Sequence, residues 1–182
     1  MTALRLSIAA GGALALALLA GCSVSIGGSD GMSAPTLERE LTDEAESQAD
    51  TELDSVECAT GLKAETGDRT QCEVAVQGVR ATWDVEVTSV EGSTINFEWE
   101  VQDGSQLLET EALLGSIGPD FEQQIGLELA GITCPQPLIE GTVGTTVVCE
   151  ATTTNGRTGD IEITVTSASG MKVDFSWRPL DG

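Results

Sequence analysis

The sequence predicts an α+β protein of two tandem small two-layer domains. Each domain is expected to have an N-terminal helix packed on a three- to four-stranded antiparallel sheet, with one disulfide. Three observations predict this fold: an internal repeat with a period of about 76 residues, an apolar stripe at helical spacing early in each copy, and alternating apolar residues at the end of each copy. Copies of this size lie near the lower limit for a self-sufficient core, where disulfides are usual.

The repeat is visible in matched positions along the chain. The first helical stripe is Leu41, Ala45, Ala49, Leu53 and Val56, and it falls on Ile117, Phe121, Ile125, Leu129 and Ile132. Steps of three and four residues mark one face of a helix. The same shift places Cys58 on Cys134, and after short slips at loops Asp84–Thr88 falls on Asp160–Thr164. We infer two homologous domains.

The domain boundaries follow from the repeat and from changes in composition. Residues 36–102 form the first domain and residues 111–182 the second, joined by a short linker at 103–110 that contains Asp103-Gly104-Ser105. Residues 22–35 are rich in glycine and serine, and they predict a flexible tether.

Residues 1–21 predict a lipoprotein signal peptide. Its apolar stretch Leu6–Ala20 is too short to cross a hydrocarbon core of ~30 Å as a helix. The stretch ends in Leu19-Ala20-Gly21-Cys22, which resembles the bacterial lipobox. This order predicts that Cys22 carries acyl chains such as palmitate and anchors the chain to the extracytoplasmic face of the cell membrane. The alternative is an ordinary secretory signal that happens to precede a cysteine.

Two helices are expected, one at the start of each domain. The first is predicted from Thr36, a good N-cap residue after Pro35, to about Leu53. The second is predicted from Pro119, which is tolerated at a first helical position, to just before Gly131. Leu113 and Leu114 are expected to form a separate turn upstream, broken from the helix at Gly118.

Four cysteines at repeated spacing in an exported chain predict disulfides. Three connectivities are possible, and the repeat favours Cys58–Cys72 and Cys134–Cys149, because each domain then has its own bridge. Closure of loops of this size is expected to contribute about 3 kcal/mol per bridge. A zinc site or a redox dithiol would need Cys-x-x-Cys spacing or histidine, and the chain has neither.

The rest of each domain predicts antiparallel strands. Apolar residues alternate with polar ones along 72–76, 83–87 and 95–101, and again along 147–153, 161–165 and 171–177. Gln77-Gly78, Glu91-Gly92 and Asn155-Gly156 supply the turns. One face of each sheet should therefore be buried under the helix and the other should be wet.

These motifs together resemble the actinobacterial domain of unknown function 4333, a family of exported proteins and lipoproteins. The resemblance is carried by a helix, the segment Cys134-Pro135-Gln136-Pro137-Leu138, a glycine, Cys149 and a strand hairpin. It covers residues 37–102 and 113–180, and the first copy departs from it at Cys58-Ala59-Thr60-Gly61. The resemblance implies the local cysteine pairing and an envelope location, and it implies no active residue.

The composition argues against catalysis. The chain has no histidine, the commonest general base and metal ligand, and none of its serines lies in a Gly-x-Ser-x-Gly elbow. No catalytic residue, metal or cofactor is expected. The sequence predicts a lipid-anchored, non-catalytic envelope protein that displays two small domains for binding or as a scaffold. The alternative is an envelope inhibitor or sensor that acts on another protein.

Charge limits the class of partner. The chain has a net charge of −22, and removal of the leader with Arg5 leaves seven basic residues against 30 acidic ones. Such a surface repels nucleic acid and favours a basic protein partner, or simply keeps the domains soluble. The candidate contact residues lie on the back of the first helix and on a wet strand face: Glu38, Asp43, Glu46, Asp50, Glu86, Glu98 and Glu100. The sequence leaves the oligomeric state open.

Overall fold

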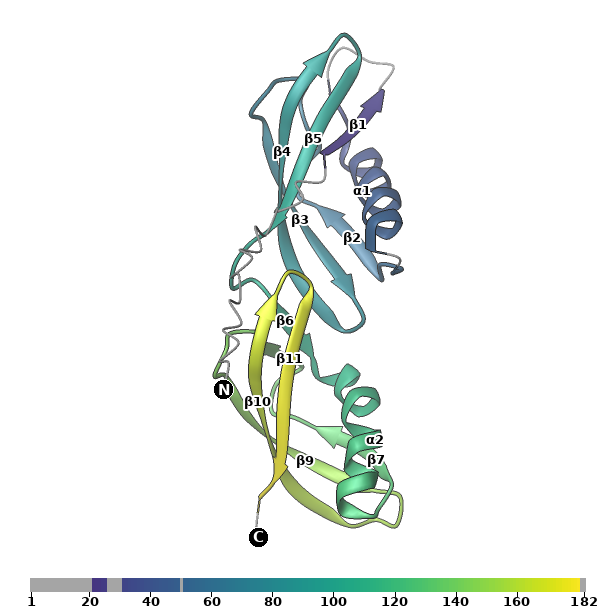
Figure 1. Cartoon of the computed structure of the whole chain (residues 1–182), viewed down its shortest axis with the longest axis vertical. Helices are drawn as coiled ribbons and strands as arrows, with labels where there is room; N and C mark the ends of the chain where they lie inside the picture. The colour runs from purple at the N-terminus through teal and green to yellow at the C-terminus, as the bar shows by residue number, and fades with distance from the viewer. Residues whose placement is uncertain (1–20, 26–30, 50, 181–182) are drawn as a thin grey trace, which may run out of the picture.

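The computed structural model describes residues 21–25, 31–49 and 51–180. The chain forms two antiparallel sheets, and one helix lies beside the strands in each half of the long axis (Figure 1). We call β1, α1 and β2–β5 the first module, and β6, α2 and β7–β11 the second module. The first module comprises β1 (Gly21–Ser25), α1 (Ala34–Ala49), β2 (Ser55–Cys58), β3 (Arg69–Val76), β4 (Val79–Glu91) and β5 (Thr94–Val101). The second comprises β6 (Leu107–Glu109), a 3-10 turn (Thr110–Ala112), α2 (Leu113–Ile125), β7 (Leu129–Thr133), β8 (Leu138–Glu140), β9 (Thr146–Thr153), β10 (Thr158–Ser169) and β11 (Lys172–Pro179).

Each helix packs its apolar stripe against strands. Helix α1 buries Leu37, Leu41 and Ala45 in a core with strands of the first sheet. Helix α2 buries Leu113, Ile117 and Phe121 in a second core. The α+β class and the burial of one helix face in each copy are therefore as the sequence predicts.

The first sheet is larger than predicted because it recruits strands from the second module. Its strand order is β1-β5-β4-β3-β2, and β6 pairs with β4 while β8 pairs with β6. The predicted linker is thus wrong at Leu107–Glu109, which form β6. Strands of three residues are too short to show a periodic pattern, so the sequence gives no sign of them. The second sheet runs β11-β10-β9-β7.

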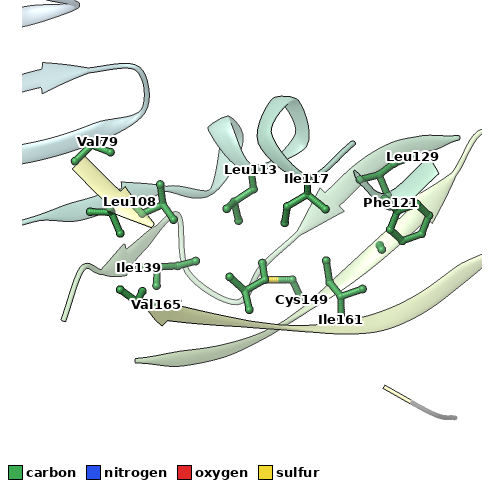
Figure 2. Packing of buried hydrophobic residues seen from close by; sticks show 13 residues of the cluster. Val79, Leu108, Leu113, Ile117, Phe121, Leu129, Ile139, Cys149, Ile161 and Val165 are labelled. Carbon is green, nitrogen blue, oxygen red and sulfur yellow. The ribbon is translucent and has the colours of Figure 1, made fainter. Parts of the chain in front are cut away.

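The second core therefore extends into the first module. Figure 2 shows Val79 of β4, Leu108 of β6 and Ile139 of β8 beside Leu113 and Ile117 of α2. The backbone NH of Glu109 also donates to the carbonyl oxygen of Gly78 at 2.7 Å. The two modules share buried apolar contacts and strand pairing, and no free linker separates them.

Both predicted helices extend too far at their C-terminal ends. Helix α1 ends at Ala49, and Val56 lies in β2, where its backbone pairs with Val74 of β3. Leu129 and Ile132 likewise lie in β7. The chain leaves the helix early because an extended edge strand is needed to bring Cys58 opposite Cys72.

Helix α2 begins at Leu113 and continues through Gly118 and Pro119, so the predicted break is wrong. Proline inside a helix costs about 3 kcal/mol. Burial of Ile117 and Phe121 on either side of Pro119 offsets that cost. The helix ends at Ile125 and is capped by Gly126, whose φ of 72° is the left-handed conformation that glycine tolerates.

The predicted tether is structured in part. Strand β1 pairs with β5 in an antiparallel register that places the backbone of Cys22 opposite Phe97. Met32 forms a β-bridge with Leu62 just before α1 begins. A Cβ on Gly61 would lie 2.0 Å from the carbonyl oxygen of Met32, which explains why the first copy has glycine here in place of a proline. The predicted signal peptide lies outside the described residues, apart from Gly21.

The strand pairing corrects the repeat alignment by two residues. Trp99 pairs with Val85 across β4 and β5, and Trp177 pairs with Ile163 across β10 and β11. Asp84 therefore corresponds to Glu162, and the predicted match of Asp84–Thr88 with Asp160–Thr164 is wrong. Similar short patterns of alternating acidic and β-branched residues fit at either offset, so only the pairing decides between them. No helix in the described part of the chain is long and apolar enough to cross a membrane.

Candidate functional site

An apolar groove of about 660 Å³ lies where the two modules meet. Its walls come from the C-terminal end of α1, the β3–β4 turn, strands β5 and β6, helix α2 and the tip of the β10–β11 hairpin. The lining residues are Ala45, Gln48, Ala49, Thr51, Leu53, Val76, Gln77, Val79, Trp83, Trp99, Leu108, Ser116, Met171, Lys172, Val173 and Phe175. Elements distant in sequence thus contribute to one site.

Two stacked tryptophans form one wall of the groove. The rings of Trp83 and Trp99 are nearly parallel, with centroids 5.8 Å apart, and Phe97 lies behind Trp99 at 6.4 Å. The indole NH of Trp83 donates to the sulfur of Met171 at 3.1 Å, across the module boundary. Sulfur contacts of this kind stabilise aromatic clusters. The contact of Met171 with Trp83 therefore holds the tip of the β10–β11 hairpin against the two stacked tryptophans.

The walls are held in place by contacts between the modules. The Gln106 side chain is buried and donates from Nε2 to the carbonyl oxygen of Gly170 at 3.1 Å. Arg80 of β4 pairs with Glu109 of β6, and this carboxylate raises the pKa of the guanidinium, chiefly by its hydrogen bond. A Cβ on Gly78 would come within 2.1 Å of the Cβ of Ala112, so only glycine allows this close approach.

A smaller hollow of about 210 Å³ occupies the equivalent place in the second module. It is lined by Phe121, Ile125, Leu127, Thr153 and Ile161, which correspond to Ala45, Ala49, Thr51, Val76 and Trp83 of the groove. In the second module the ring that stacks on Trp177 comes from the helix, because Phe121 lies 5.3 Å from it. In the first module the partner of Trp99 comes from a strand. The helix positions that correspond to Phe121 and Ile125 are Ala45 and Ala49 there, and these small side chains leave room for the groove.

The described lining of the groove has few polar groups and no acidic one. Among the described residues its lining holds two glutamines, a threonine, a serine and one base, Lys172. Lys172 Nζ lies 3.0 Å from Asp174 Oδ1, and both side chains are exposed. The pKa of Asp174 is lowered by the hydrogen bond that Ser167 donates and then by Lys172. Asp174 therefore stays ionised. Its contact with Lys172 keeps the ammonium group at the rim of the groove.

The acids predicted on the back of α1 do not form an open face. Glu38 accepts a hydrogen bond from the backbone NH of Cys58 at 2.9 Å, and Glu46 accepts one from Leu53 at 2.8 Å. The Glu38 and Glu46 side chains are only partly exposed. Their hydrogen bonds hold the segment that follows α1 against the helix. Asp43 is exposed, and Asp50 lies outside the described residues.

The acids predicted on the strand face do lie together. Glu98 pairs across the strands with Glu86, and Glu100 with Asp84. Like charges directly opposite one another are unfavourable, and Arg69 relieves one pair through a contact of 2.6 Å with Glu86. A basic partner at this face stays a prediction.

The cysteines pair as the repeat favours. Disulfides join Cys58 to Cys72 and Cys134 to Cys149. Cys72 and Cys149 are buried in the two cores. The first bridge ties the edge strand β2 to its core, and the second ties the residue that follows the edge strand β7 to its core. No group of three or more cysteine, aspartate or glutamate residues among the described residues could hold a metal ion.

Sequence reasoning missed the groove itself. It placed Trp99 on an inner face, but it did not single out Met171 or Lys172. One signal was present: Met171 is a large apolar residue directly after Gly170 at a hairpin tip, where polar residues are usual. An apolar residue at a turn indicates that the tip packs against something.

Comparison with known proteins assigns the family. The family model described as Domain of unknown function (DUF4333) matches residues 17–92 and 94–170. No curated protein and no solved structure matches the chain. The two matches follow each other in tandem, and each contains the helix and the cysteine pair of one copy of the repeat. The chain belongs to the DUF4333 family and contains two copies of its domain.

Proposed function

We propose that this protein is a lipid-anchored, non-catalytic binding module of the cell envelope, and that its binding site is the groove between the modules. The observation that carries the proposal is the groove's size and lining. Ligand sites in proteins have volumes of roughly 300–1,000 Å³, are mostly apolar with a few polar groups, and favour domain interfaces. The groove meets each of these criteria at about 660 Å³.

The contacts around the groove favour a preformed site. Trp83 is buried and Trp99 is half-buried. The Trp83 ring therefore supports the Trp99 ring, and the Trp99 ring remains accessible to a ligand. The two modules contact each other through Met171, Gln106 and strand β6. These contacts fix the positions of the groove walls relative to one another. A preformed apolar surface binds without a large ordering cost.

The proposed lipid anchor rests on the lipobox at Cys22. Replacement of Cys22 by serine is expected to move the protein from the membrane fraction to the medium, or to block its maturation, because a hydroxyl cannot take the thioether-linked lipid. Fractionation and the intact mass of the processed chain measure this. Unchanged membrane association without added acyl mass would contradict the anchor.

Filling the groove should prevent binding. The full chain, in phosphatidylcholine nanodiscs, is exposed to an uncharged alkyl probe that carries a photoreactive diazirine, and labelled residues are mapped by mass spectrometry. We expect wild-type labelling at Met171 and its groove neighbours. The variant Ala49→Trp should reduce it several-fold, because Ala49 lies exposed at the groove rim and an indole there occupies the space.

Ser47→Trp is the matched control. Ser47 is exposed on the same helix, two residues away, and does not line the groove. Two residues turn a helix by about 200°, so the new indole points away. The control should label as the wild type does. Equal loss in both variants, or labelling spread evenly over the surface, would exclude the groove as the binding site.

A further inference from the structure

We propose that the groove binds one aliphatic chain of an anionic amphiphile, with the head group at Lys172. This inference rests on the proposed function and adds the chemical class of the ligand. Three observations carry it: the lining of the groove, the distribution of charge around it, and the register of β1.

The lining fits a hydrocarbon chain. Apolar groups come from both modules, with Leu53, Val76, Trp83 and Trp99 on one side and Leu108, Val173 and Phe175 on the other. Side chains of this kind gain free energy from each methylene removed from water, about 0.8 kcal/mol per group. The few hydrogen-bonding groups of the lining leave little for a polar ligand to bind. An extended apolar chain is therefore the chemistry that this surface recognises.

The positive charge of Lys172 at the rim of the groove favours an anionic head group. The chain has 30 acidic residues, yet the described lining of the groove includes none, while it does include Lys172. An ammonium group has three donors, and its contact with Asp174 uses only one. The other donors face solvent beside the apolar lining, since the side chain is 77% exposed. An anion that binds there shares the ammonium group with Asp174, through the donors that Asp174 leaves free.

The register of β1 puts the backbone of the proposed anchor two residues along β5 from Trp99. The backbone of Cys22 lies opposite Phe97, and Trp99 follows two residues later on β5. Two residues of a strand span roughly 7 Å, so the anchored residue and the tryptophan wall are close along the strand. A chain held to the membrane at Cys22 would present the groove to the surface where amphiphiles are concentrated. The lipid on Cys22 itself is uncharged, so dependence on Lys172 distinguishes a free anionic amphiphile from the protein's own anchor.

The test compares two photoreactive probes on the full chain in phosphatidylcholine nanodiscs. One is a 16-carbon fatty acid with a diazirine along its chain, a length chosen to match palmitate, the common acyl chain. The other is the corresponding alcohol. We expect the acid to label the groove more than the alcohol and to be displaced by unlabelled palmitate. Lys172→Glu should reduce labelling by the acid roughly three- to tenfold. An exposed ion pair is weak, but this variant both removes the attraction to the carboxylate of the probe and adds a repulsion of similar size.

Two variants control for structural effects. Lys172→Arg keeps the charge and should retain labelling by the acid. Lys63→Glu reverses a second exposed lysine that does not line the groove, and it should leave labelling unchanged. Equal labelling of the groove by acid and alcohol, with no effect of Lys172→Glu, would overturn the anionic ligand class and leave the proposed function standing. Absence of groove labelling by every probe, the uncharged alkyl probe included, would overturn both.

Discussion

Phe97→Ala is expected to lower the free energy of unfolding by about 3–5 kcal/mol, the usual cost of deleting a fully buried phenylalanine. Phe97 is the largest fully buried side chain of the described residues, and it supports Trp99 from behind. Its loss leaves a cavity at the centre of the first core and removes the support of the tryptophan wall. Urea unfolding of the full chain, followed by tryptophan fluorescence, measures the change.

Phe175→Ala is the matched comparison, because Phe175 occupies the equivalent position in the second copy. It is only partly buried and lines the groove. Its replacement should cost distinctly less stability and should weaken probe labelling instead. Equal destabilisation by the two variants would contradict the assignment of Phe97 to the core and Phe175 to the groove.

Removal of the second disulfide should loosen both modules. The double variant Cys134→Ala, Cys149→Ala is expected to lose about 3 kcal/mol of stability, the chain-entropy value for a loop of this size. Strand β8 lies inside that loop and pairs with β6, which pairs with β4 of the first module. Hydrogen exchange should therefore become faster in β6 and β8 as well as in β9.

The other disulfide provides the control. The loop closed by Cys58 and Cys72 contains neither β6 nor β8. Its removal should cost similar stability and speed exchange mainly in β2 and β3. Unchanged exchange in β6 and β8 after loss of the second bridge would show that the modules are not coupled through these strands.

The two copies differ at Val79 and its equivalent. Val79 begins β4, is buried, and pairs with Leu108 of β6 in the second module. The equivalent residue in the second copy is Arg157, which is exposed. Within the described residues, the buried apolar contact that Val79 makes with the other module is therefore absent at this position of the second copy.

Much of the fold could be predicted from the sequence because it depends on local periodicity. Leu41 and Ala45 mark a helix face, Val85 and Val87 mark a strand face, and the cysteine spacing repeats. The error at the end of the first helix has a local cause. Leu53 and Val56 continue the helical spacing by coincidence, and only pairing with β3 shows that the chain is extended there.

The groove could not be predicted because it depends on how the modules meet. Met171 contacts Trp83 although 88 residues separate them, and no local pattern connects the two positions. The bridging strands β6 and β8 acquire their structure only from their partners. Glu38 and Glu46 likewise look like solvated acids in the sequence, and only the chain folded beneath them supplies the NH groups that they accept.

The most direct test of the groove as binding site is a crystal structure of the full chain with a fatty acid that carries bromine at the end of its chain. Anomalous scattering locates the bromine without ambiguity. We predict a single strong peak between Trp99 and Phe175, with the carboxylate near Lys172. A peak in the smaller hollow beside Phe121, or an empty groove at saturating ligand, would contradict the account.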